Sequence, residues 1–189
     1  HGDLRKIGNS SPRYHYGINF SANWNGIDFA VFFQGVGKID WMPSANCYYF
    51  WGPYSFPTTT FIAKDFERLA WSEDNRNTYF PRRRSYQTSS AGSMNVKTDR
   101  YLQDASYIRL KNLTVDYTFP AHICRKMRIK GLKVYVSGEN LWTSSPMFKY
   151  CDNYDPEVIN AGDSDFRTAE GDGYSYPMLR TVTLGVNLT

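Results

Sequence analysis

Apolar and polar residues alternate with period two in several segments of this chain, and no stretch of helix length repeats its apolar residues every 3.6 positions. Because successive side chains of a β-strand point to opposite faces, this alternation predicts strands with one apolar face and one polar face. The clearest segments are residues 14–24 and 27–36. Asn25-Gly26 lies between them and predicts a two-residue hairpin turn.

Three further segments, residues 105–119, 131–142 and 177–188, alternate in the same way. In the first of these the phase changes, since Ile108 and Leu110 are apolar on even positions and Leu113 and Val115 on odd positions. The change predicts either a β-bulge or the point where the strand leaves a buried zone. The chain therefore reads as an all-β protein with antiparallel strands.

Aromatic residues stand near the ends of the apolar faces, among them Tyr14, Trp24, Phe119 and Trp142. Short connections, residues 25–26 and 120–130, alternate with long ones, residues 38–103 and 143–176. Strand ends marked by aromatic rings, with short turns on one side and long loops on the other, are typical of outer-membrane β-barrels. A soluble β-sandwich also alternates, so the periodicity alone leaves that class open.

Composition narrows the classes further. The chain has 189 residues with 15 Tyr, 12 Phe and 5 Trp at a net charge of +4, which is too apolar and too weakly charged for disorder. Its mean hydropathy of −0.55 looks polar, but barrel strands with only one lipid-facing side also average out as polar. The longest strongly apolar run, residues 29–33, is far shorter than the roughly 20 residues of a membrane-spanning helix. The chain starts at His1 without a leader, so we expect a removed signal peptide or an internal fragment.

Candidate chemistry is sparse. The three cysteines have no CxxC spacing and the three histidines have no neighbouring nucleophile, so we expect no enzyme, no metal site and no cofactor. Residues 143–176 hold 2 basic and 7 acidic residues, a net charge of −5, which fits a solvated acidic loop better than a calcium site. The other long loop combines Arg82-Arg83-Arg84 with many aromatics. These rings either stack on sugars or bases, or pack the interior of the loop itself or a partner protein.

Several ordered motifs resemble the C-terminal signature of the SusC/RagA family of TonB-dependent outer-membrane transporters. The principal one is the run Tyr101-Leu-Gln-Asp-Ala-Ser-Tyr-Ile-Arg-Leu-Lys-Asn-Leu-Thr-Val-Asp-Tyr-Thr-Phe-Pro120. In family order with it come Phe32-Phe-Gln-Gly35, Glu73-Asp-Asn-Arg-Asn-Thr-Tyr-Phe-Pro-Arg82, Leu132-Lys-Val-Tyr-Val-Ser-Gly-Glu-Asn-Leu-Trp142, Tyr154-Asp-Pro-Glu157 and Tyr176-Pro-Met-Leu-Arg-Thr181. The resemblance covers nearly the whole chain.

The resemblance implies a 22-stranded barrel with an N-terminal plug. Residues 1–189 would then be the C-terminal segment of that barrel, without the plug, with long extracellular loops and a periplasmic C-terminus. It implies import of oligosaccharides or oligopeptides through the outer membrane of a Gram-negative bacterium. The implied partners are the rest of the barrel and plug, a SusD-like surface lipoprotein, the TonB-ExbB-ExbD energy-coupling system, outer-membrane lipid and a second SusC-SusD pair in a dimer; nucleic acid is not among them.

Candidate site residues follow from this topology. The polar faces predict wall residues that face the lumen, namely Asn19, Asn23, Asp28, Gln34, Asn112, Asp116 and Glu139. On the long outer loop, Trp41, Tyr49 and Trp51 are the candidates for contact with the substrate or the lid. Cys47 and Cys151 both fall on loops that the resemblance makes extracellular, so they are the candidate disulfide pair, while Cys124 falls on a periplasmic turn.

A competing class is a soluble, secreted β-sandwich that binds carbohydrate through the aromatic loop. It predicts a monomer that is stable without detergent. The barrel hypothesis predicts dependence on detergent or membrane.

Overall fold

The structure is a computed structural model. It describes residues 4–45, 47–55, 57–58, 62, 64, 66–84, 94, 96–159 and 175–189. The chain divides into two compact units. We call residues 11–39, 104–149 and 177–189 the sheet unit, and residues 1–10, 40–103 and 150–176 the loop unit.

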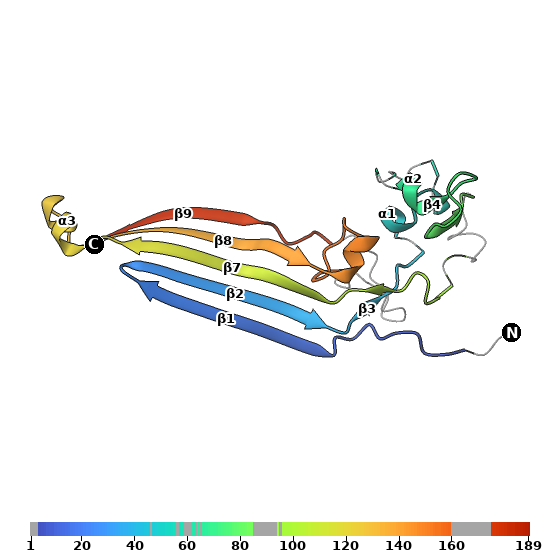
Figure 1. The fold of residues 1–189 in the computed structure, drawn as a ribbon, viewed down its shortest axis with the longest axis horizontal. Coiled ribbons are helices and arrows are strands. Elements are labelled where there is room, and N and C mark those ends of the chain that lie inside the picture. The colour runs from blue at the N-terminus through green and yellow to red at the C-terminus, as the bar shows by residue number, and fades with distance from the viewer. Residues whose placement is uncertain are drawn as a thin grey trace. The chain divides into compact units, whose positions relative to one another are not determined.

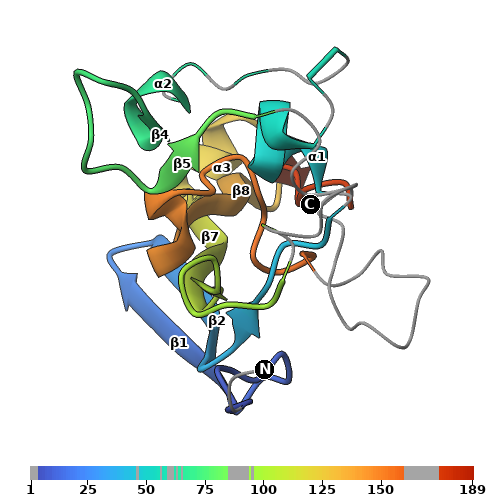
Figure 2. The same ribbon diagram turned by 90° about the vertical axis from the view of Figure 1, so that its right-hand side faces the viewer.

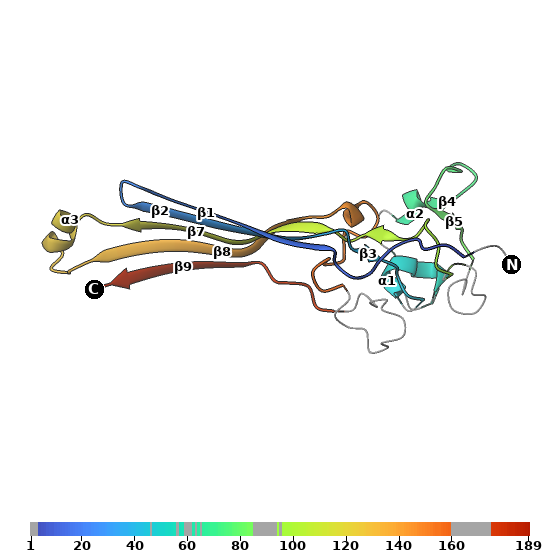
Figure 3. The same ribbon diagram turned by 90° about the horizontal axis from the view of Figure 1, so that it is seen from below.

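The sheet unit is built on one five-stranded antiparallel sheet with the strand order β1-β2-β7-β8-β9. The strands are β1 (Tyr14–Trp24), β2 (Ile27–Gly37), β7 (Tyr107–Thr118), β8 (Leu132–Ser144) and β9 (Thr181–Leu188). Figure 1 shows the strands side by side, and the edge-on view of Figure 3 shows them in a single layer. The five predicted strands are all present, with ends that differ by a few residues.

Both short connections lie at one end of the sheet (Figure 1). Asn25 and Gly26 join β1 to β2 with φ of 49° and 83°, the left-handed pair that a tight hairpin turn requires. The connection from β7 to β8, expected only as a turn, contains the short helix α3 (Ala121–Lys126). The chain leaves the opposite end of the sheet for the two long connections, and η2 (Pro146–Lys149) follows β8 there.

Where the strands pair, the register places the predicted apolar positions on one face of the sheet and the predicted polar positions on the other. Directly paired residues share a face. Phe20, for example, pairs with Val31, which pairs with Leu113, whereas Asn19 pairs with Phe32, which pairs with Asn112. We call the first of these the apolar face and the second the polar face.

The predicted phase change is a β-bulge. On β7, Leu110 pairs with Phe33 and Asn112 with Phe32, so Lys111 has no direct partner on β2. On the other side, Asn140 and Leu141 of β8 lie opposite the bulge, and Asn140 has a φ of 52°. The Asn140 side chain donates a hydrogen bond to the carbonyl of Leu179 at 3.0 Å. The bulge restores the alternation and keeps the apolar residues on one face across the phase change.

The predicted start of the last strand at residue 177 is too early. Pairing between β8 and β9 ends at Glu139 and Thr181, immediately before Asn140. The left-handed backbone at Asn140 interrupts the pairing between β8 and β9 at this point, and Pro177 has no N–H that could donate a hydrogen bond to β8. Residues 177–180 are therefore extended without belonging to the sheet.

The helices and strands in the described part of the loop unit are all short (Figure 2). They are β3 (Asp40–Trp41), α1 (Tyr48–Trp51), η1 (Gly52–Tyr54), α2 (Phe66–Leu69), β4 (Ala70–Trp71), β5 (Phe80–Arg82) and β6 (Gln103–Asp104, its last residue in the sheet unit). β3 pairs with β6, and β4 pairs with β5 in parallel. Buried aromatic rings join these elements. No helix among the described residues is long and apolar enough to cross a membrane.

Candidate functional site

The predicted wall residues lie together on the polar face. Asn19 and Asn112 both pair with Phe32, and Asn112 also pairs with Glu139, so these residues form one row across four strands. Asn23, Asp28 and Asp116 form a second row near the Asn25-Gly26 turn. Gln34 belongs to the same face through its pairing with Gly17 and Arg109. The alternation therefore predicted which residues share a face. That this face lines a lumen stays a prediction.

A small ionic cluster gives the second row its geometry. The Lys133 ammonium lies 2.8 Å from a carboxylate oxygen of Asp116 and 3.6 Å from one of Asp28. The Asn23 amide donates a hydrogen bond to the other oxygen of Asp28. One cation thus holds two carboxylates from neighbouring strands, which would otherwise repel each other across the ladder. Lys133 was absent from the predicted wall residues, although its odd position on β8 places it on the polar face.

Arg109 is a buried charge on the same face, with 3% of its surface exposed. Its Nε donates a hydrogen bond to the Thr143 hydroxyl at 2.8 Å, and its guanidinium lies 5.8 Å from the centre of the Tyr107 ring. Sequence reasoning treated Arg109 only as a polar position of a strand. Its burial depends on residues of β8 that are distant in sequence.

Two tyrosines cover glycines on neighbouring strands. Tyr16 lies over Gly35 on the apolar face, and its hydroxyl donates to the Tyr107 carbonyl at 2.9 Å. Tyr135 lies over Gly185 on the polar face. In each pair the missing Cβ leaves the space that the ring occupies. This cross-strand packing fixes the register at both margins of the sheet.

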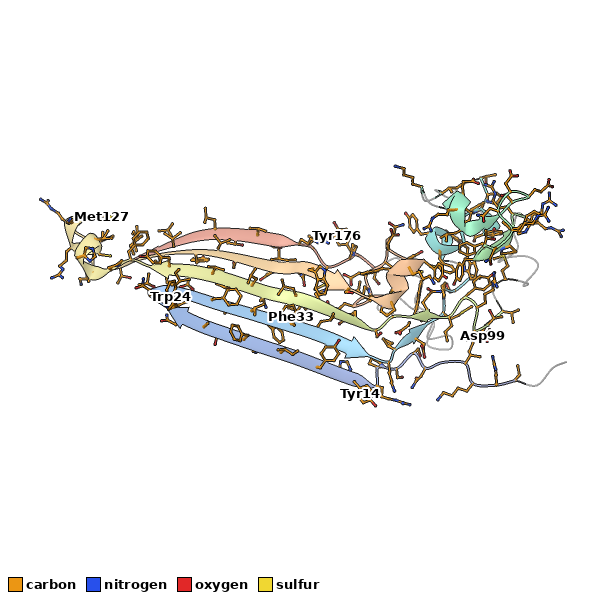
Figure 4. The ribbon with its side chains drawn as sticks, in the orientation of Figure 1. Tyr14, Trp24, Phe33, Asp99, Met127 and Tyr176 are labelled. Atoms are coloured by element: carbon orange, nitrogen blue, oxygen red, sulfur yellow. The ribbon has the colours of Figure 1, made fainter. Side chains whose placement is uncertain are left out.

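The apolar face is widely exposed, and so are both edge strands. The exposed fraction reaches 58% for Phe20 in β1 and 73% for Leu184 in β9. Tyr14 and Trp24 mark the two ends of β1, as Figure 4 shows. The exposed apolar side chains extend over several strands: Ile18, Phe20, Val115, Val136, Val182, Leu184, Val186 and Leu188. A contiguous apolar surface of this kind marks contact with a membrane or another protein.

Two of the three predicted rim aromatics are core residues of the loop unit. Trp41 is 1% exposed and Trp51 is fully buried, whereas Tyr49 is 55% exposed. The Trp51 indole donates to the Ser44 carbonyl at 2.7 Å, and its ring packs edge-on against Phe50 with 4.7 Å between centres. The alternative interpretation, that these rings pack the interior of the loop, therefore describes Trp41 and Trp51. Contact with the substrate or lid stays a prediction for Tyr49.

Other rings complete this core. Tyr79 stacks on Tyr150 with 3.9 Å between centres and an angle of 8° between planes, and its hydroxyl accepts a hydrogen bond from Gln103 at 2.7 Å. Burial raises the pKa of the Tyr79 hydroxyl, and it also raises the pKa of Tyr54 and Tyr101. These hydroxyls are neutral hydrogen-bonding groups of a packed interior, not acid–base groups poised near neutral pH.

Cys47 and Cys151 are both buried, and they are not joined by a disulfide in this structure. The Cys47 sulfur lies 3.2 Å from the Tyr154 hydroxyl, and the Tyr154 ring packs against Trp41 with 5.3 Å between centres. Burial, and after it the proximity of Cys47, raises the pKa of the Cys151 thiol. The structure contains no bond between the two sulfurs, so their pairing stays a prediction.

Within the described part of the chain, no group of three or more His, Cys, Asp and Glu side chains is placed to hold a metal ion. Four of the seven acidic residues of the acidic loop fall within residues 160–174, which lie outside the described residues. Of the arginine triplet, Arg83 pairs with Glu67 at 2.7 Å, and Arg82 lies 3.6 Å from Glu73 and 5.1 Å from the centre of the Trp71 ring.

Comparisons with known proteins agree with this architecture. No protein-family model matches the chain. TonB-dependent receptor P3 of Formosa agariphila is 31% identical over 98% of this chain, and TonB-dependent receptor P26 of the same organism is 29% identical over 99%. The chain spans only 17% and 18% of the length of these curated relatives.

Solved structures match the fold as well. A structure of the RagAB peptide transporter matches with a TM-score of 0.63 at 24% identity, covering 95% of this chain and 17% of that chain. The RagAB peptide importer in the open-open state matches with a TM-score of 0.60 at 21% identity, covering 97% and 18%. The homology is to transport proteins and not to enzymes, in agreement with the expectation that the chain has no catalytic site. The chain is thus homologous over nearly its whole length to one stretch of TonB-dependent receptors, and its antiparallel sheet has the fold of part of the RagA-type transporter.

Proposed function

We propose that this chain forms a contiguous stretch of wall, at the C-terminal end of the barrel, in an outer-membrane TonB-dependent importer. The apolar face of the sheet contacts lipid, and the polar face, with Asn19, Asp116 and Glu139, lines the lumen. The loop unit lies on the extracellular side, and the α3 turn and the C-terminus lie on the periplasmic side. The homology to TonB-dependent receptors supports the outer membrane as the location.

The observation that carries this proposal is a single-layered sheet with one exposed apolar face and two unpaired edges. A soluble sheet must cover its apolar face with a second layer, and an exposed edge strand of 11 residues invites aggregation. In a barrel, lipid covers the face, and neighbouring strands pair with β1 and β9. A barrel therefore removes both the exposed apolar face and the unpaired edges.

Strand length agrees with this placement. β1 and β2 have 11 residues each, which at roughly 3.3 Å per residue gives strands about 36 Å long. Tilted by about 45°, as barrel strands are, they span about 26 Å of membrane. That is close to the apolar band of about 25 Å found on outer-membrane barrels. Tyr14 and Trp24, at the two ends of β1, would then lie at the two interfaces.

We further propose that the complete transporter works with a SusD-like surface lipoprotein that closes over the loop unit, in a dimer of such pairs, and imports oligopeptides or oligosaccharides. The fold similarity to the two-component RagAB peptide importer supports the lid and favours peptide over glycan as the cargo. TonB-ExbB-ExbD would supply the energy through another part of the transporter. The chain itself contributes wall and rim.

The second candidate, a soluble carbohydrate-binding β-sandwich, is less well supported. A sandwich needs a second large sheet against the apolar face, and the other sheets among the described residues have two strands each. In its proposed platform, the aromatic loop, Trp41 and Trp51 are buried and Tyr49 is exposed. Nothing in the described geometry favours this candidate over the barrel.

Charge substitutions test the proposal in the full-length transporter. Arginine at Ile18, Val31 or Leu184, all on the apolar face, should cost up to about 2–4 kcal/mol, the value near the membrane midplane, and reduce the amount of folded barrel. Arginine at Val134, which pairs with Tyr117 at the aromatic end of the apolar face, should cost less. Arginine at Asn19 or Ser137, on the polar face of the same strands, should be tolerated. The measurement is the heat-modifiable band of folded barrel in outer-membrane fractions. Equal losses on both faces would refute the assignment of lipid and lumen sides.

A further inference from the structure

The α3 turn, residues 119–131 between β7 and β8, carries an unusual concentration of positive charge. Its basic residues are Arg125, Lys126, Arg128 and Lys130, and all four are exposed. No Asp or Glu occurs between Asp116 and Glu139. The turn also exposes Met127, with 56% of its surface accessible, in the middle of the basic residues (Figure 4).

No carboxylate among the described residues of this chain neutralises these charges. The structure shows no ion pair from Arg125, Lys126, Arg128 or Lys130 to any described carboxylate, and the nearby carboxylates Asp28 and Asp116 are held by Lys133. Repulsion among four unpaired cations in one short turn disfavours the fold, so something else should balance it.

The turn is an ordered platform and not a loose loop. Thr189 and Gly131 exchange backbone hydrogen bonds of 3.0 Å, and the Lys130 amide donates to the Thr189 carbonyl at 2.7 Å. The Ile129 amide donates to the Cys124 carbonyl at 3.1 Å, and Cys124, a residue of α3, is buried. Because this backbone is fixed to the sheet, the basic side chains start from defined positions at the end of the strands.

The basic turn also continues directly from the apolar face. At the same end of the sheet, Leu188 is 67% exposed and Trp24 is 74% exposed, and Tyr117 packs edge-on against Phe119 with 4.9 Å between ring centres. Moving along the strands toward α3, one meets aliphatic side chains, then aromatic rings, then cations. A lipid leaflet presents acyl chains, then the interface, then phosphates in the same order.

We propose that the α3 turn binds the phosphate headgroups of anionic phospholipids in the leaflet at that end of the barrel. Arg125, Lys126, Arg128 and Lys130 pair with the headgroups, and the aromatic rings at the strand ends contact the upper acyl chains. The inference rests on the proposed function, since it requires the apolar face to lie in a bilayer. It adds a lipid-binding site that anchors the connection between β7 and β8 to one leaflet.

The test uses the full-length transporter that carries this sequence, reconstituted in phosphatidylcholine vesicles containing a minor fraction of phosphatidylglycerol. Spin-labelled lipids measure how strongly each lipid associates with the protein. The ratio used below is the association of phosphatidylglycerol divided by that of phosphatidylcholine. Each basic residue that reaches an anionic surface should change this ratio by roughly fivefold. We therefore expect a ratio of at least about five in the wild type, decreasing with added salt, and about one after changing all four basic residues of the turn to Gln.

A matched control changes four arginines of the loop unit, Arg76, Arg82, Arg83 and Arg84, to Gln, and should leave the ratio unchanged. If the fourfold turn variant does not fold, the pairs Arg125→Gln/Lys126→Gln and Arg128→Gln/Lys130→Gln should each lower the ratio partly. An inserted wild type with a ratio of one, or a folded turn variant that keeps the wild-type ratio, would overturn this inference alone. A wild type that does not insert into the bilayer would overturn the proposed function with it.

Discussion

Two residues of α1, Tyr49 and Trp51, have different roles: Trp51 belongs to the core, and Tyr49 is a candidate contact residue. Trp51 is fully buried, whereas Tyr49 is 55% exposed. Truncating Trp51 to Ala removes ring contacts to Phe50 and Tyr101, at 4.7 and 5.1 Å between centres, and the hydrogen bond to the Ser44 carbonyl. Loss of a buried Trp side chain costs about 3–5 kcal/mol, while truncation of an exposed residue typically costs less than about 0.5 kcal/mol.

Limited proteolysis of the full-length transporter measures this difference. Cleavage within residues 40–103 tracks the population of the opened loop unit when opening is fast. A difference of about 3 kcal/mol corresponds to more than about a 100-fold faster cleavage of Trp51→Ala than of Tyr49→Ala. Tyr49→Ala should keep the protease resistance of the wild type and weaken association with the lid or the cargo. Similar cleavage rates in the two variants would refute the assignment of Trp51 to the core.

Three further predictions concern a glycine, an ion pair and two buried titratable groups. Gly35→Ala should lower the midpoint of denaturant unfolding by an amount equivalent to about 1–3 kcal/mol, because the new Cβ would lie 2.5 Å from the Tyr107 carbonyl oxygen. Gly185→Ala should cost less, because only the Tyr135 ring must move. Lys133→Met should destabilise the barrel by about 1 kcal/mol in the same assay, and adding Asp116→Asn should recover part of the loss. Burial raises the pKa of the Cys151 thiol and of the Tyr79 hydroxyl in the folded protein, so the unfolded chain loses these protons first as the pH rises. Protease resistance of the loop unit should therefore fall above about pH 8.5, the ordinary cysteine value, and again above about pH 10, the ordinary tyrosine value. Resistance that stays level to pH 11, about one unit beyond the ordinary tyrosine value, would contradict this prediction.

The sheet could be predicted from the sequence because its information is local. Alternation with period two marked all five strands, Asn25-Gly26 specified the hairpin, and the phase change after Leu110 revealed the bulge at Lys111. The polar set from Asn19 to Glu139 followed from the same alternation once the register was known. Helix α3 was missed because a single short helical segment has no period to detect.

The loop unit could not be predicted in this way. Its core joins residues far apart in the chain, such as Trp51 with Tyr101 and Trp41 with Tyr154. No local pattern tells which rings of an aromatic cluster turn inward, so Trp41, Tyr49 and Trp51 looked equivalent. Lys133 was missed for a related reason, since its partners Asp28 and Asp116 come from two other strands.

The central claim is that the apolar face of the sheet lies against lipid, and an accessibility scan along β1 tests it most directly. Single cysteines at residues 14–24 of the full-length transporter, in a background without the native cysteines, carry a nitroxide label in lipid vesicles. The account predicts that collision with oxygen, which dissolves in lipid, is high at even positions such as Ile18 and Phe20. Collision with a water-soluble nickel reagent should be high at odd positions such as Asn19. A scan without alternation, or with the opposite phase, would contradict the account.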